Sequence, residues 1–221
     1  MTDQEWLSGD DPQQMLQFLG AIPTDRKLRL FAVACCSRCA DILADPRHSR
    51  LVTVVELLAD NLTTTDARRD ARDCLFASNY ALWAATQEDA FASALRGSQD
   101  IALHVSQGGY DLVGSSASLE EKLAAVDTEY QKESIAQVEL LRDIFGNPFS
   151  PVAFSPSWRT TDVMLLAQGI YDEKAFDRMP ILADALQDAG CDSDDILNHC
   201  RDTTATHVRG CWVVDLVLGK S

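Results

Sequence analysis

The residues best suited to chemistry gather near the end of the sequence. Three of the seven cysteines and two of the four histidines fall in one stretch: Cys191, His199, Cys200, His207 and Cys211. Thiolates and imidazoles are the ligands that zinc takes most often, and a structural site needs four of them. These five residues are therefore the candidate metal ligands.

Their spacing differs from that of the common zinc motifs. No CxxC occurs, Cys191 and Cys200 are separated by eight residues, and His199 directly precedes Cys200. Adjacent residues on a helix point about 100° apart, so His199 and Cys200 cannot both face one ion easily. We expect no cofactor here, with Cys200 and Cys211 packed as small core residues and with His199 and His207 capping helix ends or bonded to backbone. A zinc site is the alternative.

Asp215 is the clearest anomaly, because it is an acid between Val214 and Leu216 in an otherwise apolar segment. A buried carboxylate must be paired or neutral. We expect an ion pair with one of three arginines: Arg178, Arg201 or Arg209. Alternatively, Asp215 acts as a general base or a ligand if a histidine lies within hydrogen-bond reach. Cys200 and His207 form a separate candidate nucleophile pair, so these three are the candidate catalytic residues.

The usual catalytic signatures do not occur. The sequence has no glycine-rich dinucleotide loop, no P-loop, no HExxH and no GxSxG. A second thiol cluster, Cys35, Cys36 and Cys39, lies among Leu, Val and Ala, where burial raises a thiol pKa and lowers its reactivity. We expect these three cysteines to pack in a core.

Helical periodicity runs through the first two thirds of the chain. Pro12 after Asp11 opens a short helix, and residues 24–44 and 47–62 carry apolar residues at helical spacing. Residues 64–85 and 91–105 continue this pattern, and the Gly- and Ser-rich residues 107–118 form a connection. Ser118 and Glu121 form a capping box for a long helix that ends at Gly146. Its expected apolar face consists of Leu119, Leu123, Val126, Tyr130, Val138, Leu141 and Phe145.

The elements that carry the cysteine and histidine cluster follow a proline-rich crossing. Thr160 or Thr161 caps one helix, Pro180 starts the next, and Ser193 caps a third. The final segment, residues 208–218, is so apolar that periodicity cannot separate a buried helix from a buried strand. We favour a helix, since every element before it is helical.

These elements predict an all-α fold. We expect a multi-helix array over residues 1–146, the proline-rich crossing over 147–160, and a compact C-terminal helical subdomain over 161–221 that packs on the array.

Charge and composition exclude several classes of protein. The chain has 19 basic and 34 acidic residues and a net charge of -15, which opposes binding to nucleic acid or to anionic membranes. It shows no secretory signal and no apolar run long enough to span a bilayer. An odd number of cysteines within helical patterns also fits poorly with a disulfide framework. We expect an acidic cytoplasmic protein.

Several short segments at both ends of the chain form a recognisable set: Glu5-Trp6-Leu7, Asp11-Pro12, residues 25–32 with Cys35-Cys36, Phe145-Gly146-Asn147-Pro148-Phe149, and residues 175–186, 190–191, 199–201 and 207–215. With these segments the chain resembles a heavily duplicated family of uncharacterised proteins of planctomycete bacteria. The resemblance covers both ends of the chain and is weak between about residues 64 and 134. It implies a bacterial cytosolic protein and carries no established activity.

The functional expectation follows from apolar packing helices, acidic solvated faces and missing catalytic motifs. We expect a non-enzymatic protein-interaction or regulatory module, with an unidentified protein partner and possible homodimerisation. The alternative is a metal- or thiol-dependent enzyme that uses the C-terminal cluster.

Overall fold

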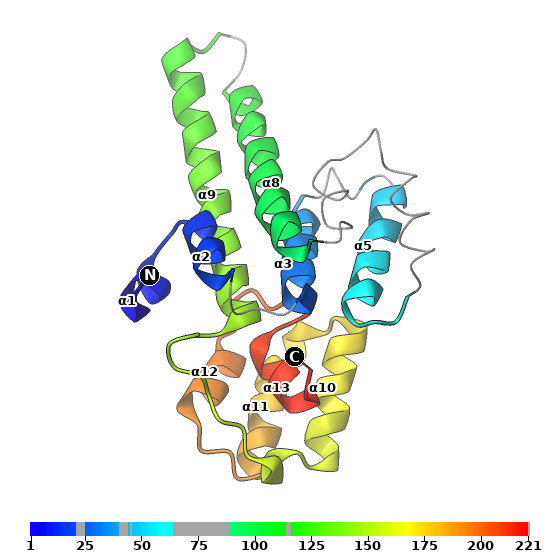
Figure 1. Cartoon of the computed structure of the whole chain (residues 1–221). Helices are drawn as coiled ribbons and strands as arrows, with labels where there is room; N and C mark the ends of the chain where they lie inside the picture. The colour runs from blue at the N-terminus through cyan, green and yellow to red at the C-terminus, as the bar shows by residue number, and fades with distance from the viewer. Residues whose placement is uncertain (21–24, 40–43, 45, 64–88, 114–115, 221) are drawn as a thin grey trace. The chain divides into compact units, whose positions relative to one another are not determined.

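The computed structural model describes residues 1–20, 25–39, 44, 46–63, 89–113 and 116–220. Every regular element in these ranges is helical, which confirms the predicted all-α class (Figure 1). Contacts divide the chain into two compact units, Met1–Leu141 and Arg142–Ser221. The division lies in the last turns of a long helix, shortly before residue 146, where the sequence places the end of the helical array.

The first unit contains six described helices. They are α1 (Asp3–Ser8), α2 (Pro12–Leu19), α3 (Asp25–Ser37), α5 (Pro46–Ala59), α8 (Ala90–Leu112) and most of α9 (Leu119–Phe145). The α3 helix packs against both α5 and α8, and α2 packs against α8. The predicted start of α2 is confirmed, because the Asp11 carboxylate accepts hydrogen bonds from two backbone N–H groups and Pro12 is the first helical residue.

The α3 helix is shorter than predicted, since it ends at Ser37 and not near Ala44. At its C-terminal end the hydrogen bonds span three residues: the N–H of Arg38 donates to the carbonyl of Cys35, and the N–H of Cys39 donates to the carbonyl of Cys36. Such i→i−3 bonds are typical of a helix terminus. The three cysteines are buried as expected, and burial raises the pKa of the Cys35 and Cys36 thiols.

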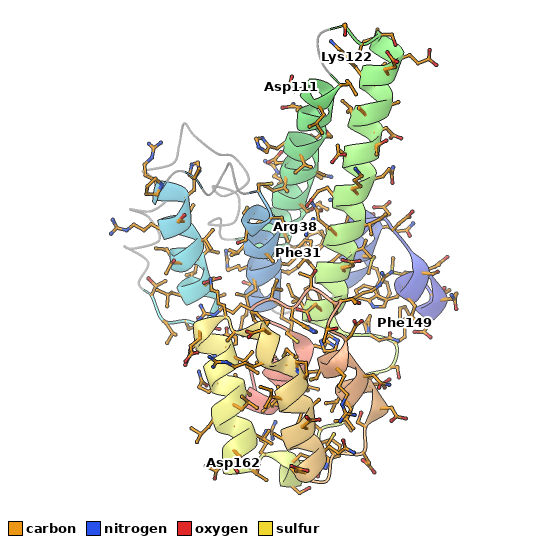
Figure 2. The ribbon with its side chains drawn as sticks, turned by 180° about the vertical axis from the view of Figure 1, so that it is seen from behind. Phe31, Arg38, Asp111, Lys122, Phe149 and Asp162 are labelled. Carbon is orange, nitrogen blue, oxygen red and sulfur yellow. The ribbon has the colours of Figure 1, made fainter. Side chains whose placement is uncertain are left out.

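The α8 helix is longer than predicted and continues through Gly108 and Gly109 to Leu112, so the connection before α9 is shorter. At Gly109 an added Cβ would lie 2.7 Å from the backbone oxygen of Ala125. Gly109 therefore permits a close approach between α8 and α9, which is a packing role and not a loop role. Figure 2 shows Asp111, near the end of α8, and Lys122, near the start of α9, at the same end of this hairpin.

The start of α9 is as predicted, but part of its expected apolar face is not buried. The Glu121 N–H donates to the Ser118 hydroxyl and the Ser118 N–H to the Glu121 carboxylate, so the capping box is present. Leu119 and Leu123 are 67% and 57% exposed, whereas Val138 and Leu141, farther along the same helix, are buried. The helices predicted within residues 64–85 lie outside the described residues.

The second unit begins with the last turn of α9 and contains four more α-helices. These are α10 (Thr161–Glu173), α11 (Met179–Asp188), α12 (Asp194–Arg201) and α13 (Trp212–Leu218), with short 3-10 turns at Pro156–Trp158 and Phe176–Arg178. The predicted caps are confirmed at Thr160 and Ser193, whose hydroxyls accept backbone N–H groups. The final apolar segment is a helix, as favoured, although it begins only at Trp212.

One apolar core holds the second unit together. It is built from residues of α10 to α13 that are almost completely buried, among them Ile170, Leu182, Leu186, Cys200 and Val214. Arg159 closes the end of α13, because its guanidinium donates to the carbonyls of Leu216 and Val217. Among the described helices, none combines the length and the apolar character that crossing a bilayer requires.

Candidate functional site

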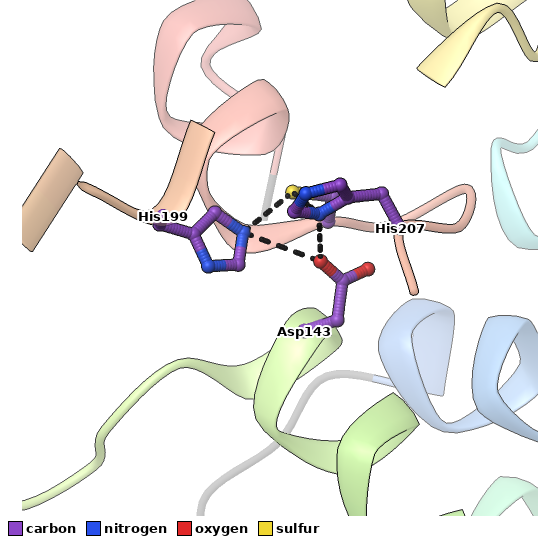
Figure 3. A group of neighbouring side chains, drawn as sticks. Asp143, His199 and His207 are labelled. Atoms are coloured by element: carbon purple, nitrogen blue, oxygen red, sulfur yellow. Dashed lines mark hydrogen bonds and ion pairs between the residues drawn. The ribbon is translucent and has the colours of Figure 1, made fainter. Parts of the chain in front are cut away.

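Four side chains of the second unit bring potential metal-ligand atoms together. They are Asp143, His199, His207 and Cys211, and one ligand atom from each lies within 4.8 Å of all the others (Figure 3). This is the only such group that the described residues form. Three of its members belong to the cluster predicted from sequence, and Asp143 is new.

The contacts within this group are short. Asp143 Oδ1 lies 2.8 Å from His207 Nδ1 and 3.2 Å from His199 Nε2. Cys211 Sγ lies 3.2 Å from the same nitrogen of His199 and 4.0 Å from the same nitrogen of His207. Each imidazole therefore presents one nitrogen to both the carboxylate and the thiol.

Local sequence features place these four side chains. Asp143 is on the last turn of α9, which Gly146 ends with a φ of +65°. His199 is on the last turn of α12, and His207 follows in the connection to α13. Cys211 is the N-terminal cap residue of α13, directly after Gly210 with a φ of +94°. Both glycines adopt left-handed conformations that other residues rarely adopt.

Asp143 is the anchor of the group. Its Oδ1 accepts from His207, while its Oδ2 accepts the backbone N–H of Val208 at 2.9 Å. Burial disfavours the charged carboxylate, but hydrogen bonds from His199 and His207 outweigh it and lower the pKa of Asp143. The other ring nitrogen of His207, Nε2, is buried and has no hydrogen-bond partner among the described residues. The polar contacts of this ring are therefore directed at Asp143 and Cys211.

The thiol of Cys211 is buried completely and is not activated. Burial raises its pKa well above the ordinary value, and the negative charge of Asp143 adds to this effect. The backbone N–H groups of Val213 and Val214 act in the opposite direction without cancelling it. Burial likewise raises the pKa of the neighbouring Cys200 thiol to about 12. A nucleophilic cysteine needs a lowered pKa and access to substrate, and both thiols have a raised pKa and are buried.

The arrangement of the imidazoles also differs from a proton relay. In a Cys–His–Asp relay the histidine contacts the thiol with one ring nitrogen and the carboxylate with the other. Here Nε2 of His199 faces both Asp143 and Cys211, and Nδ1 of His207 does the same. Four donor atoms that face one common point are what a metal ion requires.

The remaining predicted site residues lie outside this group. Cys191 and Cys200 are 4% and 0% exposed and belong to the apolar core of the second unit. Asp215 is 1% exposed on α13, so its side chain is buried as the sequence suggested. None of these three contributes a ligand atom to the four-residue group that the described residues form.

Two of the arginines predicted to pair with Asp215 contact other carboxylates. Arg178 pairs with Glu173 at 2.9 Å, and Arg201 pairs with Asp184 at 3.2 Å. The guanidinium of Arg209 lies over the ring of Tyr171, 4.7 Å from its centroid. The pairing of Asp215 with Arg209 stays a prediction.

Sequence reasoning missed Asp143, although a signal was present. Leu140 and Leu141 precede it and Ile144 and Phe145 follow it, with Arg142 between. The criterion that singled out Asp215, an acid in an apolar stretch, applies here too. With Arg142 beside it, however, the segment also fits an ordinary mixed-charge helix face.

Comparisons of the chain with family models, with curated proteins and with solved structures give no match. The geometry of the site is therefore the basis for assigning a function.

Proposed function

We propose that the second unit binds one zinc ion through Asp143, His199, His207 and Cys211, and that the ion has a structural role in a non-enzymatic module. The observation that carries this proposal is the convergence of four donor atoms, of the types that zinc takes, within 4.8 Å of one another.

The distances suit a tetrahedral ion. With bonds of about 2.0 Å to nitrogen or oxygen and about 2.3 Å to sulfur, neighbouring ligand atoms of a tetrahedron are about 3.3 to 3.5 Å apart. Four of the six separations run from 2.8 to 4.0 Å, on both sides of this range, and all six lie within 4.8 Å. Binding of the ion would therefore require side-chain movements that draw the more distant donor atoms together.

Charge and burial favour zinc in a closed site. A carboxylate and a thiolate together balance the two positive charges of the ion, and the two imidazoles are neutral ligands. The side chains of Asp143 and His207 are 4% and 5% exposed, and Cys211 is 0% exposed. Four protein ligands without an open position are typical of structural sites, whereas catalytic zinc keeps a position for water.

For the whole chain we retain a role in protein interaction or regulation, because a closed zinc site stabilises a fold and supplies no reactive group. Location in the cytoplasm is part of this proposal, since the described cysteines are free thiols.

A metal-dependent enzyme is the second candidate. It is favoured by one observation: the side chain of His199 is 17% exposed, so this ligand is the one that water could replace.

Elemental analysis of the purified protein tests the proposal. We expect close to one equivalent of zinc per chain, and loss of that zinc in both Asp143→Asn and His207→Ala. Asp143→Asn is the more informative variant because its amide keeps the shape of the carboxylate and removes the charge. A helical circular dichroism spectrum shows that each variant is folded. Folded wild-type protein that takes up no zinc after incubation with the metal would refute the site.

A further inference from the structure

The indole of Trp212 donates a hydrogen bond to the metal-site histidine on the side away from the other ligands. Its Nε1 lies 3.2 Å from Nδ1 of His199, and the two rings are 5.1 Å apart. An indole N–H can only donate, so Nδ1 of His199 must be the acceptor. The proton of the neutral imidazole is then on Nε2.

That proton is on the atom that faces the site. Nε2 of His199 lies 3.2 Å from both Asp143 Oδ1 and Cys211 Sγ. Bound to a metal through Nε2, a neutral imidazole must carry its proton on Nδ1. Metal-bound histidines nearly always donate that other N–H to a carboxylate, a carbonyl or water. Here Nδ1–H would meet the N–H of Trp212, and two donors would face each other.

His207 has no such conflict. It would bind the ion through Nδ1, and its proton would move to Nε2, which has no hydrogen-bond partner among the described residues either way. The clash between two facing donors is therefore confined to His199 and comes from one N–H group.

We propose that Trp212 is a positioning residue that holds His199 in the tautomer of the metal-free site, so that its hydrogen bond and a bound metal exclude each other. This inference rests on the proposed zinc site. Trp212 lowers the affinity of the site, and its indole N–H reports whether the site is filled. Without this hydrogen bond the same four ligands would bind zinc more tightly.

The test compares zinc affinity in the wild-type protein and in Trp212→Phe, measured by competition with a chromogenic chelator. Phenylalanine keeps an aromatic ring against Gly146 and removes the donor. Loss of one competing hydrogen bond should tighten zinc binding about 2- to 10-fold. Trp158→Phe is the matched control: Trp158 packs on the same core, with its ring 5.3 Å from Phe154, and its replacement should leave the affinity unchanged.

An affinity of Trp212→Phe that equals or falls below that of the wild type overturns the inference, because a merely structural tryptophan would give that result. If Trp212→Phe does not fold, the indole N–H resonance of wild-type Trp212 decides by nuclear magnetic resonance. It should shift strongly upfield when zinc is added, as the hydrogen bond breaks, and a resonance that stays in place overturns the inference. If the wild-type protein binds no zinc, the metal site itself is refuted. That outcome differs from an unchanged affinity of Trp212→Phe, which leaves the metal site in place and refutes only the role of Trp212.

Discussion

At the residue scale, the two neighbouring buried thiols have different expected roles. Cys211 and Cys200 are both fully buried, and burial raises the pKa of both. Only Cys211 lies in the four-residue group, 3.2 Å from Nε2 of His199. The sequence predicts that both cysteines pack in the core. Under the proposed zinc site, Cys200 keeps this packing role and Cys211 binds the metal.

We predict that Cys211→Ala abolishes thiolate coordination, while Cys200→Ala keeps it. In the absence of metal, both variants lose one buried sulfur and should lose comparable stability, about 1 kcal/mol or somewhat more. Cobalt(II) substituted for zinc gives a sulfur-to-metal charge-transfer absorption band when a thiolate is bound. The band should be present in Cys200→Ala and missing in Cys211→Ala, and the reverse pattern would contradict our assignment of the ligand.

Three of the four residues of the candidate site could be predicted from the sequence, because their residue types are rare in this chain. Histidine and cysteine are rare enough for His199, His207 and Cys211 to be noticed, whereas carboxylates are abundant in an acidic chain. Asp143 precedes His207 by 64 residues, so only the fold brings them together. The spacing also indicated that the adjacent residues His199 and Cys200 could not easily face one ion together. In the structure only His199 belongs to the four-residue group.

At the element scale, two adjacent glycines in α8 have opposite environments. A Cβ added to Gly109 would lie 2.7 Å from the backbone oxygen of Ala125 on α9, whereas a Cβ on Gly108 would have no atom within 4 Å. Backbone atoms cannot move aside cheaply. A substitution at Gly109 therefore measures the need for close packing against α9. A substitution at Gly108 measures only the intrinsic cost of glycine in a helix.

We predict that Gly109→Ala lowers the free energy of unfolding by about 1 to 3 kcal/mol, because the helices must separate. Gly108→Ala should raise it by about 0.5 to 1 kcal/mol, because alanine is the better helix former. Urea unfolding followed by circular dichroism measures both changes. Equal effects of the two substitutions would show that α8 and α9 do not approach closely at Gly109.

Helix starts could be predicted from sequence more reliably than helix ends. The caps at Asp11, Ser118, Thr160 and Ser193 are local interactions between a side chain and its own first turn, so a few residues specify them. By contrast, α8 continues to Leu112 past Gly109, which lies close to the backbone of Ala125 on α9. A pair of glycines reads as a loop until the packing partner is known.

At the scale of the whole molecule, the ligands belong to one unit only. Asp143, His199, His207 and Cys211 all lie in Arg142–Ser221. An ion that binds only the folded form stabilises that form by about 2.7 kcal/mol when its concentration is 100 times its dissociation constant. That stabilisation should be restricted to the unit that holds the ion.

We predict that zinc slows hydrogen exchange of backbone amides in residues 142–221, most strongly in α12 and α13. Amides in residues 1–141 should exchange at the same rate with and without the metal. Mass spectrometry of peptides from the full chain, with zinc and then with a chelator, measures this difference. Equal protection of both units, or protection of the first alone, would contradict a site confined to the second.

The burial of the donor atoms has a kinetic consequence. A chelator in solution cannot reach an ion whose ligand side chains are 0 to 17% exposed unless the unit first opens. Metal exchange would then run at the rate of local unfolding, independent of the concentration of the competing chelator. The lifetime of the bound ion would then be set by how often this part of the chain opens, whereas its occupancy at equilibrium would still be set by the affinity of the site.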